Sequence, residues 1–369
     1  MIMQNLINQI FDKNIREFFK SDNNRENKYD RFDVIKQFLL RKDFNGFTSD
    51  DLFIMQFIKK GWGQDIAALS HMGEALVNLS IKYPNDNQYN DLISEVLKRA
   101  LHPKVNPYKR DIEKTRTFGK FGYYLEHLNI ILGCYQRVVG DKYLILNERV
   151  SNHLLRASML YDNYHADLLP NVNMKWSADQ AAIIYSLWLF DKNNGTNYSD
   201  DLNVKWLGYM NEKGRHKRTG LYKTEVLGTR KYSNQPRGCS IAYLVHYLAR
   251  FAPEEAEKQW SQFKKHMMTS VLGNTGFREY LKDYNGRWTP DSGPIIKGIG
   301  IAATGLALNA ASTVNDMATF KKINKGMSMV HSVIKNGDVI PGVNMITKIG
   351  TDLLSSAIWL NAETKEQWY

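Results

Sequence analysis

The sequence predicts an all-α fold in which consecutive helical hairpins close into a ring, an (α/α) toroid of about six hairpins. Helical periodicity dominates the 369 residues, whereas the alternation of apolar and polar residues typical of strands is scarce. Candidate helices follow one another as antiparallel pairs, and this pairing recurs about every 50 residues. No Gly- or Ser-rich linker divides the chain. We therefore predict one domain over 1–369, with 1–60 as outer N-terminal helices.

The candidate helices are defined by amphipathic periods and bounded by Gly, Pro and Asp. In chain order they cover 1–20, 31–40, 49–60, 65–83, 89–101, 117–139, 142–160, 176–190, 200–212, 236–251, 253–272, 294–311, 315–334 and 343–360. The turn at Gly140-Asp141 is tight, so the helices on either side of it form a helical hairpin. Pro294 suits the first position of a helix, where no N–H donor is needed, and Asp291 or Ser292 can cap that helix.

Long polar loops precede several helices that are rich in small residues. The loops over 162–175, 213–235 and 274–289 hold most of the Trp, Tyr, Arg and carboxylate residues outside helices. The clearest case is 276–311, where charged and aromatic residues lead into a nearly uncharged helix of Gly and Ala. Each helical Gly costs about 1 kcal/mol relative to Ala, so we expect close approach of a neighbouring helix in return. Loops of one type gather at one rim of a toroid, which is where we expect a ligand site.

The net charge of +11 does not indicate a nucleic-acid partner. The basic residues are dispersed, and the densest group, 213–218, has no nucleic-acid-binding motif around it. Cys134 and Cys239 are too few for a disulfide framework or a metal cluster, so buried free thiols are expected. We predict neither a metal site nor a cofactor, because the sequence shows no pair of histidines at helical spacing with a carboxylate nearby.

The N-terminal segment 1–20 reads as an amphipathic helix that can contact a membrane surface peripherally. It lacks the basic start and uninterrupted apolar stretch of a secretory signal. We therefore expect a cytoplasmic protein, or a periplasmic one if a leader is missing. The longest weakly charged run, 299–314, is shorter than the roughly 20 apolar residues that span a membrane.

Short motifs follow one another in a characteristic order between residues 117 and 314, about half the chain. They are Glu126-His127-Leu128-Asn129, Trp176-Ser177-Ala178-Asp179, Thr219-Gly220-Leu221-Tyr222 with Glu225, Pro236-Arg237-Gly238-Cys239-Ser240, Arg278-Glu279-Tyr280 and Asp291-Ser292-Gly293-Pro294. This order resembles the helical-toroid proteins related to linalool dehydratase/isomerase. The resemblance implies an (α/α) barrel with a ligand pocket at one end, like that of many glycan-processing toroids. It also implies acid/base removal of water from a small alcohol, with His127 at the position of that family's histidine. The family's cysteine pair is absent, and Asp179 stands in its region.

The rim loops carry more carboxylates than structure requires. Two carboxyl groups that face one bond, one protonated and one ionised, supply the acid and the base of sugar cleavage. We predict Asp179 and Asp291 as this pair, with Glu225 and His127 as further catalytic candidates. The predicted substrate-binding residues stack on sugar faces or hold polar and anionic groups. They are Trp176, Tyr222, Arg237, Arg278, Glu279, Tyr280 and Trp288.

Each of these residues also has a purely structural interpretation. Asp179 lies in a first helical turn, where the helix dipole favours a carboxylate. His127 on an aromatic face can be a core residue, and its neighbour Glu126 points about 100° away on the helix. Arg278 and Glu279 can pair to order their loop. Arg237 can likewise pair with Asp291 across the rim.

Three functions fit these patterns. The preferred one is an acid/base enzyme, a hydrolase or lyase, that acts on a glycan or another polyhydroxylated substrate. The second is a hydro-lyase or isomerase on a small, terpenoid-like alcohol, which requires a closed and mostly apolar pocket. The third is a non-catalytic protein that binds an anionic membrane surface through its N-terminal helix.

Overall fold

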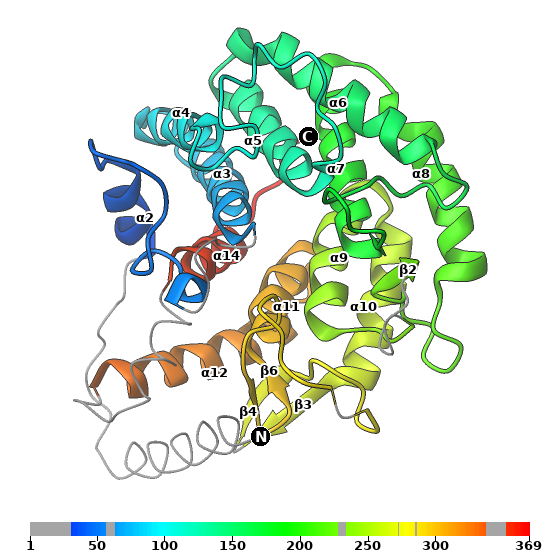
Figure 1. Cartoon of the computed structure of the whole chain (residues 1–369). Helices are drawn as coiled ribbons and strands as arrows, with labels where there is room; N and C mark the ends of the chain where they lie inside the picture. Colours follow the sequence, from blue (N-terminus) through cyan, green and yellow to red (C-terminus); the bar gives the residue numbers. More distant parts are fainter. Residues whose placement is uncertain (1–30, 57–62, 228–233, 272, 285, 337–351) are drawn as a thin grey trace.

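The structure is a computed structural model that describes residues 31–56, 63–227, 234–271, 273–284, 286–336 and 352–369. Six of the described helices form an inner ring, in which each packs on the next and the last returns to the first (Figure 1). In order around the ring they are α3 (Gln64–Lys82), α5 (Gly122–Val138), α7 (Ser177–Asn194), α9 (Gly238–Phe251), α11 (Ile301–Thr313) and α14 (Leu353–Glu363). The predicted (α/α) toroid is therefore confirmed.

An outer layer of helices covers this ring (Figure 1). It consists of α2 (Arg31–Leu39), α4 (Gln88–Leu101), α6 (Leu144–Met159), α8 (Tyr198–Tyr209), α10 (Pro253–Met267) and α12 (Met317–Asn336). The two layers differ in sequence as their burial requires. The outer helix α10 is amphipathic, so it buries Trp260 and Phe263 and leaves its charged face in water. Inner helices such as α7 are apolar on nearly every side.

Small residues let the inner helices approach closely, as predicted. Ala303 and Ala307 of α11 are fully buried. A Cβ atom placed on Gly238 at the start of α9 would lie 2.7 Å from the Cβ of Ala303. Gly133 of α5 packs in the same way against Leu189 of α7. Gly305 is different, because a Cβ there would meet no atom within 4 Å.

The predicted helix start at residue 294 is wrong. Residues Ile295–Ile296 (β5) pair with Ile299–Gly300 (β6), and α11 begins only at Ile301. Lys297 and Gly298 between the strands both have positive φ, which a tight two-residue hairpin turn requires. Consequently neither Asp291 nor Ser292 caps α11 with its side chain; Gly300 is the N-cap residue.

Three further predictions need correction or lie outside the described residues. The helix expected over 253–272 ends at Met267, because Met268–Val271 (β3) pairs with Asn274–Phe277 (β4). Within the segment 49–60, the described part is helical only over Phe53–Gln56, as a short 3₁₀ turn. The N-terminal segment 1–20 and its predicted membrane contact lie outside the described residues. Among the helices of the described residues, none has the combined length and apolarity needed to cross a bilayer.

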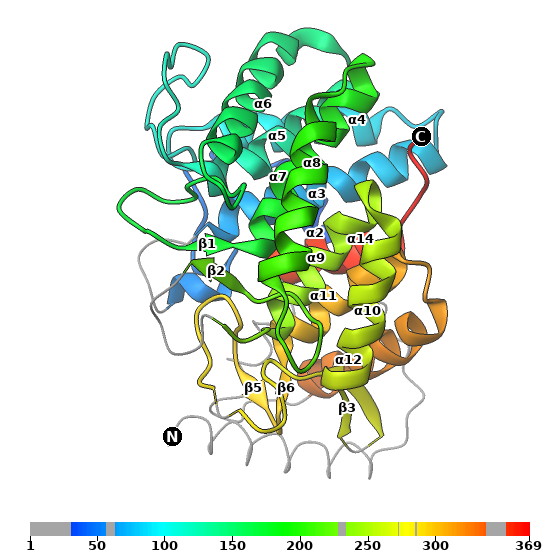
Figure 2. The same cartoon turned by 90° about the vertical axis from the view of Figure 1, so that its right-hand side faces the viewer.

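The polar loops meet at one end of the ring, where the inner helices begin (Figure 2). The strand Lys175–Trp176 (β1), just before α7, pairs with Glu225–Leu227 (β2) in the loop that precedes α9. The backbone N–H of Gly238 donates to the carbonyl of Glu279, which joins the loops before α9 and α11. The side chain of Gln64 at the start of α3 donates to the carbonyl of Pro290. The predicted rim is thus a connected surface.

Candidate active site

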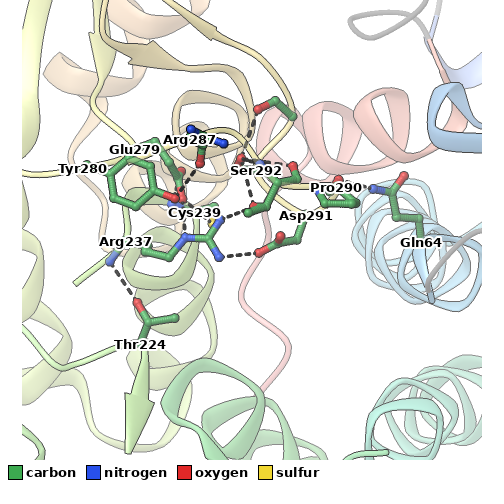
Figure 3. A network of polar contacts seen from close by, with 12 residues as sticks. Gln64, Thr224, Arg237, Cys239, Glu279, Tyr280, Arg287, Pro290, Asp291 and Ser292 are labelled. Carbon is green, nitrogen blue, oxygen red and sulfur yellow. Dashed lines mark hydrogen bonds and ion pairs between the residues drawn. The ribbon is translucent and has the colours of Figure 1, made fainter. Parts of the chain in front are cut away.

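Arg237 connects the loop before α9 to the loop before α11 at this rim (Figure 3). Its Nε atom donates to Glu279 Oε1 at 2.8 Å, Nη1 donates to Asp291 Oδ2 at 2.8 Å, and Nη2 donates to Thr289 Oγ1 at 2.6 Å. The Arg237 side chain is 6% exposed, whereas that of Asp291 is 62% exposed. The predicted Arg237–Asp291 ion pair is confirmed. These bonds use three of the five N–H donors of Arg237, and its side chain is almost wholly buried, so it is poorly placed to hold an anionic substrate group.

Glu279 is the buried half of this network. It is fully buried, and the backbone N–H and the thiol of Cys239 both donate to its carboxylate at 3.1 Å. Burial raises the pKa of Glu279, and the positive charge of Arg237 opposes that rise. Burial also raises the pKa of Cys239 well above its usual value, so this residue is a neutral thiol. Both cysteines are free and buried, as predicted.

A second group of acidic residues surrounds Tyr123, in the first turn of α5. Burial raises the pKa of the Tyr123 hydroxyl well above its usual value, and the negative charges of Asp179, Glu126, Asp65 and Asp291 raise it further. These carboxylates come from α7, α5, α3 and the loop before α11. Asp179 and Asp291 thus lie close enough for their charges to interact. Burial, with a contribution from the charge of Asp291, raises the pKa of Asp179 to about 7.

Glu126 and His127 lie deeper in the same region of α5, and both are fully buried. Neither carboxylate oxygen of Glu126 has a hydrogen-bond partner among the described residues. Burial, then repulsion by Asp179, raises the pKa of Glu126 well above its usual value. Burial lowers the pKa of His127 to about 3, so its imidazole is neutral. Although the two residues start about 100° apart on the helix, Glu126 Oε1 lies 3.8 Å from His127 Nε2. The two side chains thus converge at their tips.

His127 also contacts the neighbouring inner helix. Its Nε2 atom lies 3.1 Å from the hydroxyl of Tyr243 on α9. Its Nδ1 atom has no hydrogen-bond partner within the described part of the chain. The ring of Tyr123 lies edge-on to the imidazole, with the ring centroids 4.9 Å apart. His127 is therefore a buried residue that borders the acidic group around Tyr123.

The predicted substrate contact of Tyr222 and the alternative pairing of Arg278 with Glu279 are wrong. Tyr222 is fully buried; its ring lies edge-on to Trp206 of α8, and its hydroxyl donates to Asn211. The loop folds back at the bridge between Arg215 and Tyr222, which directs the ring into the core. Arg278 does not pair with Glu279, because neighbouring residues of an extended segment point to opposite sides. Its Nη2 lies 3.4 Å from Thr269 Oγ1 instead.

The remaining predicted site residues differ in how far their side chains are exposed to solvent. Trp176 and Trp288 are half-buried in the rim loops. Tyr280 is 7% exposed, and its hydroxyl donates to the carbonyl of Arg287. Its ring lies beside Gly286, where a Cβ atom would come within 2.2 Å of it. Glu225 is buried where β2 pairs with Trp176. Trp176 and Trp288 are thus the aromatic residues of this group with an accessible surface.

Sequence reasoning missed one cluster with metal-binding chemistry. The ligand atoms of His71, Glu74 and His246 all lie within 4.8 Å of one another, and the three residues are buried. Two imidazoles and a carboxylate suit zinc or a similar ion. However, Glu74 accepts hydrogen bonds from Tyr185 and Asn361 and lies 3.0 Å from His246 Nε2. These bonds satisfy both oxygens of Glu74 without an ion. The spacing from His71 to Glu74, one helical turn, was the available signal.

No family model and no curated protein matches the sequence. Solved structures match its fold. A family 76 glycoside hydrolase from a bovine Bacteroides thetaiotaomicron strain aligns with a TM-score of 0.54 at 11% identity, covering 82% of this chain and 68% of that chain. A polysaccharide lyase aligns with a TM-score of 0.52 at 12% identity, covering 81% and 89%.

A third match is an inactive variant, with two aspartates replaced, of an alpha-1,6-mannanase from Salegentibacter sp. HEL1_6, in complex with alpha-1,6-mannotetrose. It aligns with a TM-score of 0.50 at 11% identity, covering 82% of this chain and 88% of that chain. The resemblance to linalool dehydratase/isomerase is therefore wrong; it rested on short motifs, and the cysteine pair of that family is absent. The chain shares the (α/α)-toroid fold of family 76 glycoside hydrolases and of a polysaccharide lyase.

Proposed function

We propose that the protein is an acid/base enzyme that cleaves a glycan at the rim of the toroid, as a hydrolase or a lyase. The observation that carries this proposal is the pair Asp179 and Asp291. Burial raises the pKa of Asp179 to about 7, so a substantial fraction of it is a carboxylic acid at neutral pH. Asp291 is an exposed carboxylate that Arg237 holds in place. The shared fold of the hydrolases and the lyase supports the substrate class.

In a hydrolase these two residues have complementary roles. The protonated Asp179 donates its proton to the glycosidic oxygen as the bond to the leaving sugar breaks. Asp291 acts on the opposite side of that bond, either as the base that activates water or as the nucleophile. Its Oδ2 binds Arg237, and its side chain remains 62% exposed and accessible to substrate. The half-buried Trp176 and Trp288 offer ring faces on which sugars stack.

A lyase would instead remove a proton from the carbon next to a uronate carboxylate and form a double bond as the leaving oxygen departs. This chemistry needs a cation that neutralises the substrate carboxylate. Arg237 is 6% exposed and donates to Glu279, Asp291 and Thr289, so little of it can reach a substrate carboxylate. Arg278 is half-buried and makes one 3.4 Å contact with Thr269, which leaves it as the candidate cation of a lyase.

The test is digestion of a panel of neutral and uronate-containing polysaccharides, including an alpha-1,6-mannan and polygalacturonate. Hydrolysis produces new reducing ends alone, whereas a lyase also produces an ultraviolet-absorbing unsaturated sugar. We expect Asp179→Asn and Asp291→Asn each to lower the cleavage rate by about 10²–10⁴-fold. Asp201→Asn serves as the control, because Asp201 is an exposed residue of the outer helix α8. Cleavage at the wild-type rate by both rim variants, with unchanged folding, would refute the assignment.

A further inference from the structure

A cavity lies at the end of the ring opposite the rim, where the inner helices α7 and α9 end. Its volume is about 310 Å³, which is within the usual range for ligand pockets of about 300–1,000 Å³. The residues that line it include Tyr185, Trp188, Lys192, Arg250, Trp368 and Tyr369. Asp179 and Lys192 both lie on α7, 13 residues apart, so the cavity is about 20 Å from the rim along that helix. It is a site separate from the proposed active site.

Arg250 of α9 carries buried donors that have no acceptor. Its Nε and Nη2 atoms are buried and have no hydrogen-bond partner among the described residues. A buried polar group without a partner is costly, and a buried charge is more costly still. Native proteins satisfy such groups almost always. An unsatisfied guanidinium in the wall of a cavity is therefore available to an acidic ligand.

The charges around the cavity also favour an anion. Burial lowers the pKa of Lys365 to about 7, and the positive charge of the nearby Arg250 contributes to that decrease. Lys192 is an exposed residue of the cavity lining. The nearby carboxylate of Glu74 is already bound by Tyr185, Asn361 and His246. Three basic side chains thus lie at this end of the ring, and the hydrogen bonds of Glu74 leave its carboxylate turned to other partners.

Aromatic rings form the rest of the wall. The rings of Trp188 and Tyr369 meet edge-on with their centroids 5.6 Å apart, and Tyr185 stacks on Trp188. The Trp368 ring lies 5.6 Å from the Arg250 guanidinium. Trp368 is fixed from both sides, since its indole donates to Asn78 and its carbonyl accepts from Arg137. A wall of fixed aromatic rings beside a guanidinium is typical of sites that bind a sugar-sized ring with an acidic group.

We propose that this cavity binds a small ring-shaped oxyanion, a sugar that carries a carboxylate, sulfate or phosphate group. Arg250 donates from Nε and Nη2 to two oxygens of that group in a bidentate pair. The ring packs against Trp188 and Tyr369. The C-terminal residues 367–369 form part of the cavity wall.

The test is titration of the full chain with glucuronate, glucose 6-sulfate, glucose 6-phosphate and glucose, followed by calorimetry and by tryptophan fluorescence. We expect at least one of the three anions to bind and glucose not to bind. The anion that binds most tightly identifies the acidic group. Arg250→Met and Trp188→Leu should each weaken binding at least tenfold. Arg156→Gln, which removes an exposed arginine from the outer helix α6, should not change it.

Two further measurements make the result decisive. Asp179→Asn should bind the same anion as the wild type, so failure of the proposed rim chemistry leaves this inference intact. In anion-free buffer, Arg250→Met should be about as stable as the wild type, because Nε and Nη2 lose no hydrogen-bond partner among the described residues and only the contact with the Trp368 ring changes. Binding of none of the anions, or equal binding by Arg250→Met, would overturn the proposal. A large loss of stability in anion-free Arg250→Met would do so too, because it would reveal an internal partner for the guanidinium.

Discussion

Nη1 of Arg237 lies 2.8 Å from Oδ2 of Asp291, so a buried guanidinium fixes an exposed carboxylate at the rim. The same guanidinium donates through Nε to Glu279, which is fully buried. Arg237 therefore links the core of the toroid to its proposed catalytic surface. Gln64 and a hydrogen-bonded turn at Thr289 hold the backbone on either side of Asp291, and Arg237 holds its carboxylate.

Replacement of Arg237 by Met should destabilise the protein by about 3–5 kcal/mol, because Glu279 then remains buried without its cation. Cleavage of the glycan should also fall, because Asp291 is no longer held. The free energy of unfolding is measured by urea denaturation, and activity is measured on the polysaccharide that the wild type cleaves.

The double variant Arg237→Met/Glu279→Gln separates the two effects. A neutral amide at position 279 removes the unpaired charge, so stability should return in part while activity stays low. Recovery of both properties in the double variant would show that Arg237 does not act through Asp291.

The rate of glycan cleavage should fall as pH rises through about 7. The pKa of Asp179 is raised to about 7 by burial, so the proton that it donates as an acid is lost above that pH. The measurement is kcat/KM from pH 5 to 9. The residual activity of Asp179→Asn should not decline in this way as pH rises. If the decline were the same as in the wild type, a group other than Asp179 would be the acid that titrates near pH 7.

The ring and its rim could be predicted because they follow from local periodicity. Apolar faces at helical spacing identify most of the helices, and short turns pair them. The hairpin at Ile295–Gly300 was missed because the positive φ of Lys297 cannot be read from the residue type. The inward direction of Tyr222 depends on how its loop folds back onto α8, which no local pattern encodes. His246 meets Glu74 from a distant part of the chain, so their proximity needs the closed ring.

Stability should fall as pH drops below about 6.5, in part because of His165. This residue is fully buried; its Nε2 accepts from the Trp206 indole, and its Nδ1 faces the carbonyl of Asn163. Burial lowers its pKa to about 3, so between about 6.5 and 3 the unfolded chain binds a proton that the folded chain does not. Folding therefore becomes less favourable as pH falls through this range. The contribution is at most about 1.4 kcal/mol per pH unit.

The variant His165→Gln isolates this contribution. All other titrating groups are common to both proteins, so the difference between their unfolding free energies, measured from pH 7.5 to 5, reports His165 alone. The wild type should have the steeper decline. Parallel curves would mean that His165 keeps its ordinary pKa in the folded protein.

Two glycines near the contact between α9 and α11 should respond oppositely to alanine. A Cβ at Gly238 would lie 2.1 Å from the carbonyl oxygen of Arg278, so Gly238→Ala must push the two loops apart. Overpacking of this kind costs about 1–3 kcal/mol. Gly305 lies inside α11, where a Cβ meets no atom within 4 Å. Gly305→Ala should stabilise the protein by about 0.5–1 kcal/mol, the helical preference for Ala over Gly.

Urea denaturation of both variants checks this pair, and each serves as the control of the other. Gly238 lies between Arg237 and Cys239, which adds a second readout. A shift of the backbone at Gly238 also moves these two residues, which donate hydrogen bonds to Glu279. Gly238→Ala should therefore also reduce glycan cleavage, whereas Gly305→Ala should leave it unchanged. Stabilisation by both substitutions would contradict the close approach of the Gly238 backbone to Arg278. Destabilisation by both would show that Gly305 lies against a neighbour after all.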